Sequence, residues 1–413
     1  MATSRILDNS FTAAKKKRIK TMKRIYILFW LSLSAFGVQA QPGINRVLES
    51  IEANNKTLLA SKQMTEAQKL EANTGKYLAN PTVELNQLWA DRSAGGNSNE
   101  LAVVQAFDFP TVYSNKNKLA KLKSATYDHQ YAASRQQILL SAKQICLEIV
   151  YLRKQKNILD SRLKNAERLA ALYHQRLESG DANQMELNKI QLEKINAQNA
   201  SRLNEAALRA QLEKLRNLNG GITIDFTDDN YEIIPTLPEY SRLENEYLAA
   251  DPSLKSLAGE TETANREVKL SRAQSLPKFD LGYRRNGGSE EKMNGFRIGM
   301  SIPLWENKNT VKTAKAQAEY AAANMDDNTQ ALKSTLRELY TQAQALQNSS
   351  AEYAQALASQ RNEELLNKAL EAGQISMIDY FVEITLLYDS IQNYLDVEKE
   401  YHTLVAQLLQ YTL

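Results

Sequence analysis

The chain has few of the residues that build disulfide frameworks and metal centres. Among its 413 residues there is a single cysteine, Cys146, which excludes an intramolecular disulfide framework. The three histidines, His129, His174 and His402, lie far apart in sequence, so no metal-ligand spacing is visible. The sequence contains no nucleophile–base pair, glycine-rich phosphate loop or metal cluster, and we therefore expect no cofactor and no enzymatic activity. Cys146 is expected to be a small apolar filler at a helix interface.

Proline and glycine are also scarce, with 8 and 15 occurrences, and proline is absent from two long stretches, 111–234 and 304–413. Helix-forming residues dominate both stretches, which predicts long helices. The apolar and small residues between Ile138 and Leu177 recur at alternating steps of four and three. This heptad-like pattern is typical of helices that pack as coiled coil.

The N-terminus contains the only strongly apolar run, Ile25 to Phe36, which is too short to span a bilayer as a helix. It follows a basic pair and precedes a small-x-small cleavage motif, so residues 22–40 are predicted to be a secretory signal peptide. Residues 1–21 are expected to be a mis-assigned extension upstream of Met22. Residues 1–40 hold eight Lys/Arg and one Asp, so the net charge of +3 becomes +3 − 7 = −4 after cleavage. The basic balance therefore belongs to the leader, and no nucleic-acid partner is expected.

The remaining sequence repeats itself with a period near 195 residues. The segment ANNKTL (53–58) matches AADPSL (249–254), and LESG (177–180) matches LEAG (370–373). Two repeats are therefore expected, 41–218 and 239–413, joined by a linker, 219–238. Each is predicted to contain one helix, a β-hairpin, a very long helix, a single glycine and a returning helix. The predicted helices are 44–79, 111–179 and 181–218 in the first repeat, and 239–276, 304–372 and 374–411 in the second.

The hairpins are predicted at 82–109 and 278–302, where apolar and polar residues alternate with period two. Strands of about 9–11 residues would suit a tilted strand crossing a bilayer. An ordinary half-buried soluble hairpin is an equal alternative on this pattern alone. One chain offers only four strands, which cannot close a barrel, so membrane insertion would require several chains. Trp89 and Trp305 could be aromatic residues at the lipid boundary or could simply pack at strand ends.

These features resemble the TolC-like outer-membrane efflux protein family over roughly residues 41–413. The resemblance rests on the duplicated unit, the prolines that open the hairpins at Pro81 and Pro277, the Phe109-Pro110 and Ile302-Pro303 hairpin ends, and the two glycines. It implies a homotrimer with a shared 12-stranded β-barrel in the outer membrane and an α-helical tunnel in the periplasm. It also implies two partners, a periplasmic adaptor and an inner-membrane transporter of the RND or ABC type. The hairpin style and the short linker are similar to the heavy-metal efflux branch of the family.

The resemblance also assigns candidate site residues. The glycine turns imply adaptor-contact tips at Ser179, Gly180, Asp181, Ala372, Gly373 and Gln374. Acidic residues six positions after each glycine imply a pore entrance at Glu186 and Asp379, although charges on solvated helix faces are an equal alternative. The family's polar closing pair is replaced here by Leu370 and Ile375, so its mechanism of closure does not transfer.

Two other readings of the chain remain open. A secreted coiled-coil structural or adhesin-like protein would carry the same helices, with hairpins that never enter a membrane. A periplasmic adaptor would also contain a helical hairpin, but such proteins flank one hairpin with small β-domains. The apolar hairpins in both halves favour the channel.

Overall fold

The computed structural model describes residues 43–89, 96–234, 237–287, 292–358 and 362–413. The predicted signal peptide and the extension before it lie outside these ranges. The chain divides into two units, Met1–Arg46 and Val47–Leu413. The first contributes only residues 43–46 to the described ranges, so the architecture given below is that of the second unit.

Helices dominate the described residues, as predicted. In the first half of the chain they are α2 (Gly43–Asn54), α3 (Lys56–Ala72), α4 (Pro110–Glu178) and α5 (Gln184–Leu218). In the second half they are α6 (Tyr240–Ala250), α7 (Pro252–Gln274), α8 (Thr310–Ala358), α9 (Asn362–Glu371), α10 (Met377–Leu408) and the short 3₁₀ helix η2 (Gln410–Thr412). No helix in these ranges is long and apolar enough to cross a membrane.

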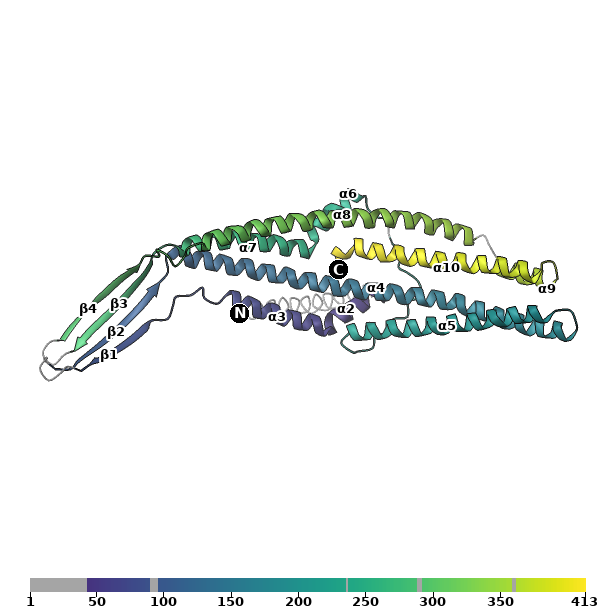
Figure 1. The fold of residues 1–413 in the computed structure, drawn as a ribbon, viewed down its shortest axis with the longest axis horizontal. Coiled ribbons are helices and arrows are strands. Elements are labelled where there is room, and N and C mark those ends of the chain that lie inside the picture. The colour runs from purple at the N-terminus through teal and green to yellow at the C-terminus, as the bar shows by residue number, and fades with distance from the viewer. Residues whose placement is uncertain (1–42, 90–95, 235–236, 288–291, 359–361) are drawn as a thin grey trace, which may run out of the picture. The chain divides into compact units, whose positions relative to one another are not determined.

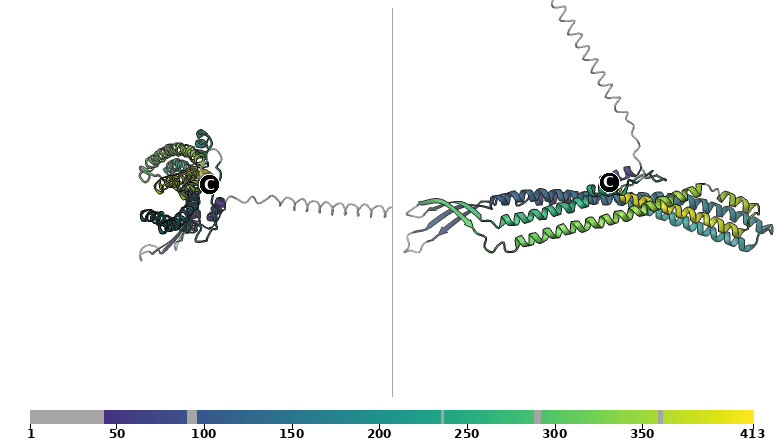
Figure 2. Two further views of the ribbon diagram at one scale, coloured as in Figure 1. Left: turned by 90° about the vertical axis from the view of Figure 1, so that its right-hand side faces the viewer. Right: turned by 90° about the horizontal axis from the view of Figure 1, so that it is seen from above.

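The long helix α4 is the central element of the second unit. Its 69 residues correspond to about 100 Å at the helical rise, and its bounds differ from the predicted 111–179 by one residue at each end. Pro110 occupies its first turn, where a missing backbone N–H has no cost. Helices α3, α5, α7 and α10 all contact α4, and α8 contacts α7 and α10 (Figure 1). The helices thus lie side by side along one axis (Figure 2).

The prediction of one uninterrupted helix at 44–79 is wrong. The chain breaks between α2 and α3 at Asn55, whose side-chain Oδ1 accepts a 2.8 Å hydrogen bond from the backbone N–H of Leu58. The helical segment also ends at Ala72, before the hairpin. An N-terminal cap of this kind satisfies an otherwise unpaired N–H and is worth about 1 kcal/mol.

The predicted helix 239–276 is interrupted in the same way. Asp251 caps α7 by accepting a 2.8 Å hydrogen bond from the N–H of Leu254, and Pro252 occupies the first helical position. Asp251 lies 196 residues after Asn55.

The remaining helix predictions need smaller corrections. The helix predicted at 304–372 begins later than expected, because α8 starts at Thr310, directly after Asn309 with its positive φ of 69°. The end of α8 and the start of α9 flank residues 359–361, which lie outside the described ranges. The returning helices α5 and α10 start three residues later than the predicted 181 and 374, because a capped turn precedes each of them.

One antiparallel sheet contains all four strands in the order β1-β2-β3-β4. The strands are β1 (Thr82–Leu88), β2 (Ser98–Phe107), β3 (Lys278–Gly287) and β4 (Lys292–Ser301), so β1 is shorter than predicted. The central pairing β2–β3 joins the two halves of the chain, with Val103 opposite Tyr283. Among the residues that the structure describes, the edge strands β1 and β4 each pair with a neighbouring strand on one side only. The sheet lies at one end of the second unit, and the turns α4–α5 and α9–α10 lie at the other (Figure 1).

Candidate functional site: the helical tips and the sheet

The first tip is the turn between α4 and α5, and Gly180 makes it possible. Its φ is +83°, a conformation that glycine adopts without the steric cost that other residues meet. The N–H of Gly180 donates to the Leu177 carbonyl at 3.2 Å, and that of Asp181 donates to the Arg176 carbonyl at 2.7 Å. These two bonds form a Schellman motif, which satisfies the last carbonyls of α4. Ser179 closes the turn, since its Oγ donates to Asp181 Oδ2 at 2.9 Å.

The second tip, between α9 and α10, has the same geometry. Gly373 has a φ of +69°, and its N–H donates to the Leu370 carbonyl at 3.2 Å. The N–H of Gln374 donates to the Ala369 carbonyl at 2.8 Å, and that of Ala372 to Lys368 at 3.0 Å. Both glycines therefore have the left-handed conformation that commonly ends a helix. Their role in adaptor contact stays a prediction.

Glu186 and Asp379 lie in the first turns of the returning helices α5 and α10. Asn183 and Glu186 form a capping box: the N–H of Glu186 donates to Asn183 Oδ1, and the N–H of Asn183 donates to Glu186 Oε2, both at 3.0 Å. Ser376 and Asp379 repeat this arrangement, with the N–H of Asp379 donating to Ser376 Oγ at 3.1 Å. Each carboxylate thus lies at a helix N-terminus, where negative charge is favourable. This role was missed in the sequence, although the spacing of an Asn or Ser three residues before an acid could have predicted it.

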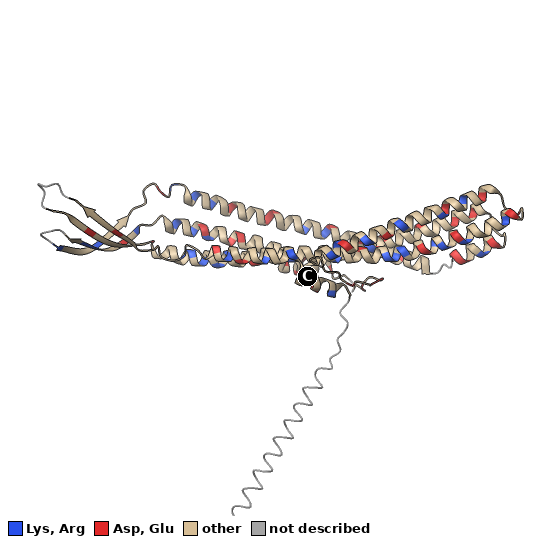
Figure 3. Ribbon diagram, turned by 90° about the horizontal axis from the view of Figure 1, so that it is seen from below, with Lys and Arg blue, Asp and Glu red and all other residues tan. Residues whose placement is uncertain are grey.

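The tips carry mainly acidic side chains (Figure 3). Glu178, Asp181 and Glu371 are exposed there, in addition to the two capping carboxylates. The capping bonds of Glu186 and Asp379 lie within one chain, so their role at the helix N-termini does not require a partner protein. The pore-entrance assignment of Glu186 and Asp379 stays a prediction.

An apolar cluster beneath the tips joins the two helical hairpins. Leu370, which replaces one member of the family's polar closing pair, is only 2% exposed, and Ile375 packs against the same cluster. Burial of this kind stabilises the packing of the second hairpin against α4. The buried members are Leu169, Tyr173, Leu187, Ile190, Leu370, Met377, Tyr380, Ile384 and Tyr388.

Polar contacts add to this cluster at the boundary between α4, α9 and α10. The buried Asn165 Nδ2 donates to Tyr380 Oη at 2.7 Å, and Tyr380 Oη donates to Asn367 Oδ1 at 2.8 Å. Burial raises the pKa of Tyr380, which keeps the phenol protonated as this chain of bonds requires. Arg168 of α4 forms an ion pair with Glu371 of α9. The two tips are therefore held to each other within one chain.

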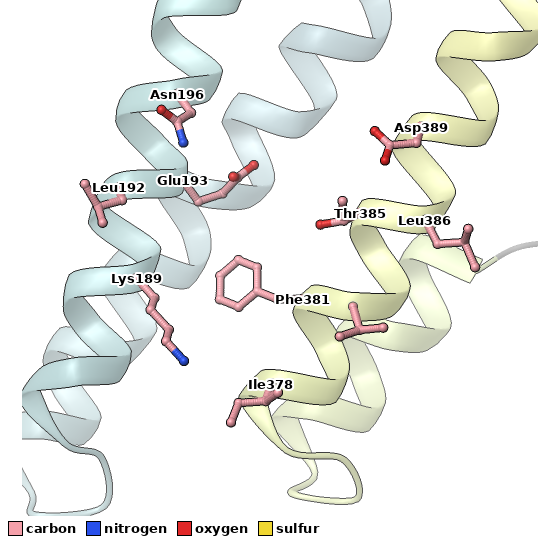
Figure 4. A pocket seen from close by; sticks show the side chains of 10 residues that line it. Lys189, Leu192, Glu193, Asn196, Ile378, Phe381, Thr385, Leu386 and Asp389 are labelled. Carbon is pink, nitrogen blue, oxygen red and sulfur yellow. The ribbon is translucent and has the colours of Figure 1, made fainter.

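Next to the tips, residues of α5 and α10 line an open groove of about 750 Å³ (Figure 4). Phe381 of α10 points across it toward α5, and Leu192, Ile378 and Leu386 present apolar side chains. Its polar members are Lys189, Glu193, Asn196, Thr385 and Asp389.

At the other end of the second unit, the sheet has two different faces. Residues directly opposite each other in an antiparallel sheet share a face, so the strand register assigns every side chain. One face is largely apolar, and it is exposed in the single chain: Phe296 is 90% and Ile298 80% exposed. The apolar face consists mainly of Val83, Leu85, Leu101, Val103, Phe107, Phe279, Leu281, Tyr283, Phe296, Ile298 and Met300.

The opposite face carries charge. Arg284 forms an ion pair with Glu100, and Arg297 forms one with Asp280 at 3.3 Å. Three of the four charged residues that β3 and β4 place on this face lie opposite a glycine, in the pairs Asp280–Gly299, Arg284–Gly295 and Gly282–Arg297, whereas Lys278 lies opposite Ser301. A Cβ at Gly299 would overlap the Asp280 carboxylate, so glycine lets that side chain lie flat across the neighbouring strand.

The model of the outer membrane efflux protein family matches residues 243–412. The second half of the chain is therefore similar to this family of outer-membrane efflux proteins. Among curated proteins none is significantly similar.

Solved structures share the fold of this chain. A membrane protein from Pseudomonas aeruginosa is similar with a TM-score of 0.76 and 15% identity, covering 90% of this chain and 90% of that one. The channel CusC is similar with a TM-score of 0.72 and 16% identity, covering 91% of this chain and 94% of its own. The outer membrane protein VceC from Vibrio cholerae has a TM-score of 0.74 and 14% identity, with coverage of 89% and 95%.

Trp89 and Trp305 lie at the ends of the sheet. Trp89 follows β1 directly and is 77% exposed, and Trp305 lies between β4 and α8 and is 79% exposed. Trp89 therefore marks the strand end far from the helices, and Trp305 marks the end next to them. Their predicted place at the lipid boundary stays a prediction. Cys146 is buried in α4, in agreement with a packing role.

Proposed function

We propose that this chain is the outer-membrane channel of a tripartite efflux or type I secretion-like export system, acting as a passive exit duct across the periplasm. The observation that carries the proposal is the sheet, whose exposed apolar face is backed by a charged face. A strand with lipid on one side and water on the other needs this alternation. A soluble sheet would instead bury its apolar side against a core.

The proposed assembly is a homotrimer with a shared 12-stranded barrel. One chain leaves the edges of β1 and β4 unpaired, and unpaired backbone groups are not tolerated in lipid. Three copies supply twelve strands, and their charged faces line the bore. The glycines opposite charged residues support this orientation, since small residues suit the crowded concave side of a curved sheet.

The proposed helical part is a periplasmic coiled-coil tunnel. The helices that surround α4 and α8 extend away from the sheet, so three copies would continue the bore from the barrel to the tips. The tips, Ser179–Asp181 and Ala372–Gln374, would contact a periplasmic adaptor, and Glu186 and Asp379 would lie at the tunnel entrance. The adaptor would link the channel to an inner-membrane transporter of the RND or ABC type.

Heavy-metal cations are the cargo that we propose to test first. The support is the similarity of the hairpins and the short 219–238 linker to the heavy-metal branch. The described residues contain no cluster of His, Cys, Asp or Glu that could hold a metal ion. Any choice of cargo is therefore assigned to the transporter, and the duct itself would be passive.

Fractionation of cells that express the chain tests this function. We expect the protein in outer-membrane fractions as an SDS-resistant trimer that dissociates to monomer on boiling. A secreted coiled-coil or adhesin-like protein would remain soluble or be released without outer-membrane insertion. Recovery as a soluble periplasmic monomer would refute the proposed function.

A further inference from the structure

Among the described residues, one carboxylate on the charged face of the sheet has no ionic partner. Glu84 lies on β1, at one edge of the sheet, and forms no ion pair among the residues that the structure describes. At the opposite edge, on β4, Arg297 binds Asp280 of β3 through its Nε at 3.3 Å. The Arg297 side chain is still 55% exposed. A guanidinium has five N–H donors, so Arg297 can bind a second carboxylate.

The stagger of the strands predicts how two copies meet. A line of directly opposed residues crosses the sheet from Thr82 through Val104 and Gly282 to Arg297. Strand β1 begins on this line, whereas β4 continues four residues past it toward the helices, to Ser301. If the helix-side ends of all strands lie at one level of the membrane, Thr82 of one copy is opposite Ser301 of the next.

Two independent features agree with this register. In this register each copy is shifted by four residues relative to the next, which is about 13 Å along the strand direction. The four strands of one copy extend about 19 Å across the sheet. This corresponds to a strand tilt of about 35°, which lies within the usual range for barrels. The register also places Val83 opposite Met300 and Leu85 opposite Ile298, so that the apolar face continues across the junction.

We propose that β1 of one copy pairs with β4 of the next in this register, and that Arg297 forms an ion pair with Glu84 of the neighbouring copy. Glu84 is then opposite Gly299 and diagonal to Arg297, within reach of long side chains. Arg297 holds two carboxylates, Asp280 of its own chain and Glu84 of the next, and each junction of the trimer contains one such bridge. The inference rests on the proposed trimeric barrel.

Cysteine cross-linking tests the register. Thr82→Cys with Ser301→Cys, and separately Leu88→Cys with Gly295→Cys, should give covalent dimers and trimers on non-reducing gels after mild oxidation. Thr82→Cys with Gly295→Cys is the matched control and should remain uncross-linked, because these positions are six residues out of register. The native Cys146 is buried, and single-cysteine variants control for its reaction.

The ion pair itself is tested by a double-mutant cycle on the temperature at which the SDS-resistant trimer dissociates. Glu84→Gln should lower this temperature, and Arg297→Gln should lower it further, because it also leaves Asp280 unpaired. The double variant should dissociate no lower than Arg297→Gln alone. Fully additive losses would overturn the bridge.

The outcomes separate this inference from the proposed function. If the unmodified chain forms no trimer in the outer membrane, the proposed function fails and the junction fails with it. If the unmodified trimer forms but only the out-of-register pair cross-links, the register is wrong and the channel stands.

Discussion

Gly180→Pro and Gly373→Pro should each abolish efflux while leaving the trimer intact. Both glycines have positive φ, +83° and +69°, whereas proline is fixed near −65°. Both also donate a backbone hydrogen bond, to Leu177 and Leu370, that proline cannot make. The tips would therefore be remodelled without any change in the sheet. The measurement is survival of a host that lacks its own channel, on a compound that the unmodified chain exports.

Asparagine at the same positions is the matched control. A Cβ added to Gly180 or Gly373 would have no described neighbour within 4 Å, so only the backbone conformation limits substitution. Asparagine tolerates the left-handed region better than other side chains, and Gly180→Asn and Gly373→Asn should keep most of the efflux. Heat-modifiable trimer must persist in all four variants. Normal efflux in both proline variants would remove the docking role of the tips.

Leu370→Ala should strongly destabilise the end of the molecule that carries the tips. Leu370 is 2% exposed in the cluster that joins the two helical hairpins. Truncating a buried leucine costs about 2–5 kcal/mol, because transfer energy is lost and a cavity remains. The purified trimer should therefore lose helical circular dichroism at a lower temperature than the unmodified protein.

Leu365→Ala on the same helix is the control for this prediction. Leu365 is 60% exposed, so its truncation removes little buried surface and should change the transition only slightly. Equal shifts in the two variants would show that the apolar cluster does not hold the tips together.

The extent of α4 could be predicted from sequence because its limits are chemical. Pro110 suits a first helical turn, and Gly180 suits the turn that follows a helix, so both ends were placed within one residue. The alternation in the hairpins likewise predicted which residues share a face of the sheet. Local rules suffice wherever one residue determines the backbone conformation.

The breaks at Asn55 and Asp251 can also be predicted from the sequence, because local capping interrupts a helix even where the surrounding composition favours it. Each residue caps a helix through its own side chain, which is a local interaction. Asn55 and Asp251 occupy the same position in the matching segments ANNKTL and AADPSL. The capping boxes at Glu186 and Asp379 are local interactions of the same kind.

The contacts beneath the tips could not be predicted from local pattern. Asn165 and Tyr380 are separated by 215 residues, and their hydrogen bond depends on how the two helical hairpins pack. From the sequence, Leu370 is notable only because it replaces a polar closing residue of the family. In the structure it is a buried core residue. Such roles follow from tertiary packing, which composition and spacing do not specify.

Thiol labelling of the two sheet faces in intact cells tests the central claim most directly. Gly295→Cys lies on the charged face, with no described atom within 4 Å of its Cβ, and Phe296→Cys lies on the apolar face. A water-soluble, membrane-impermeant maleimide should label Gly295→Cys rapidly, since that face lines an aqueous bore. Phe296→Cys should be protected by lipid and become labelled only after denaturation. Equal labelling of both positions in intact cells would contradict the channel.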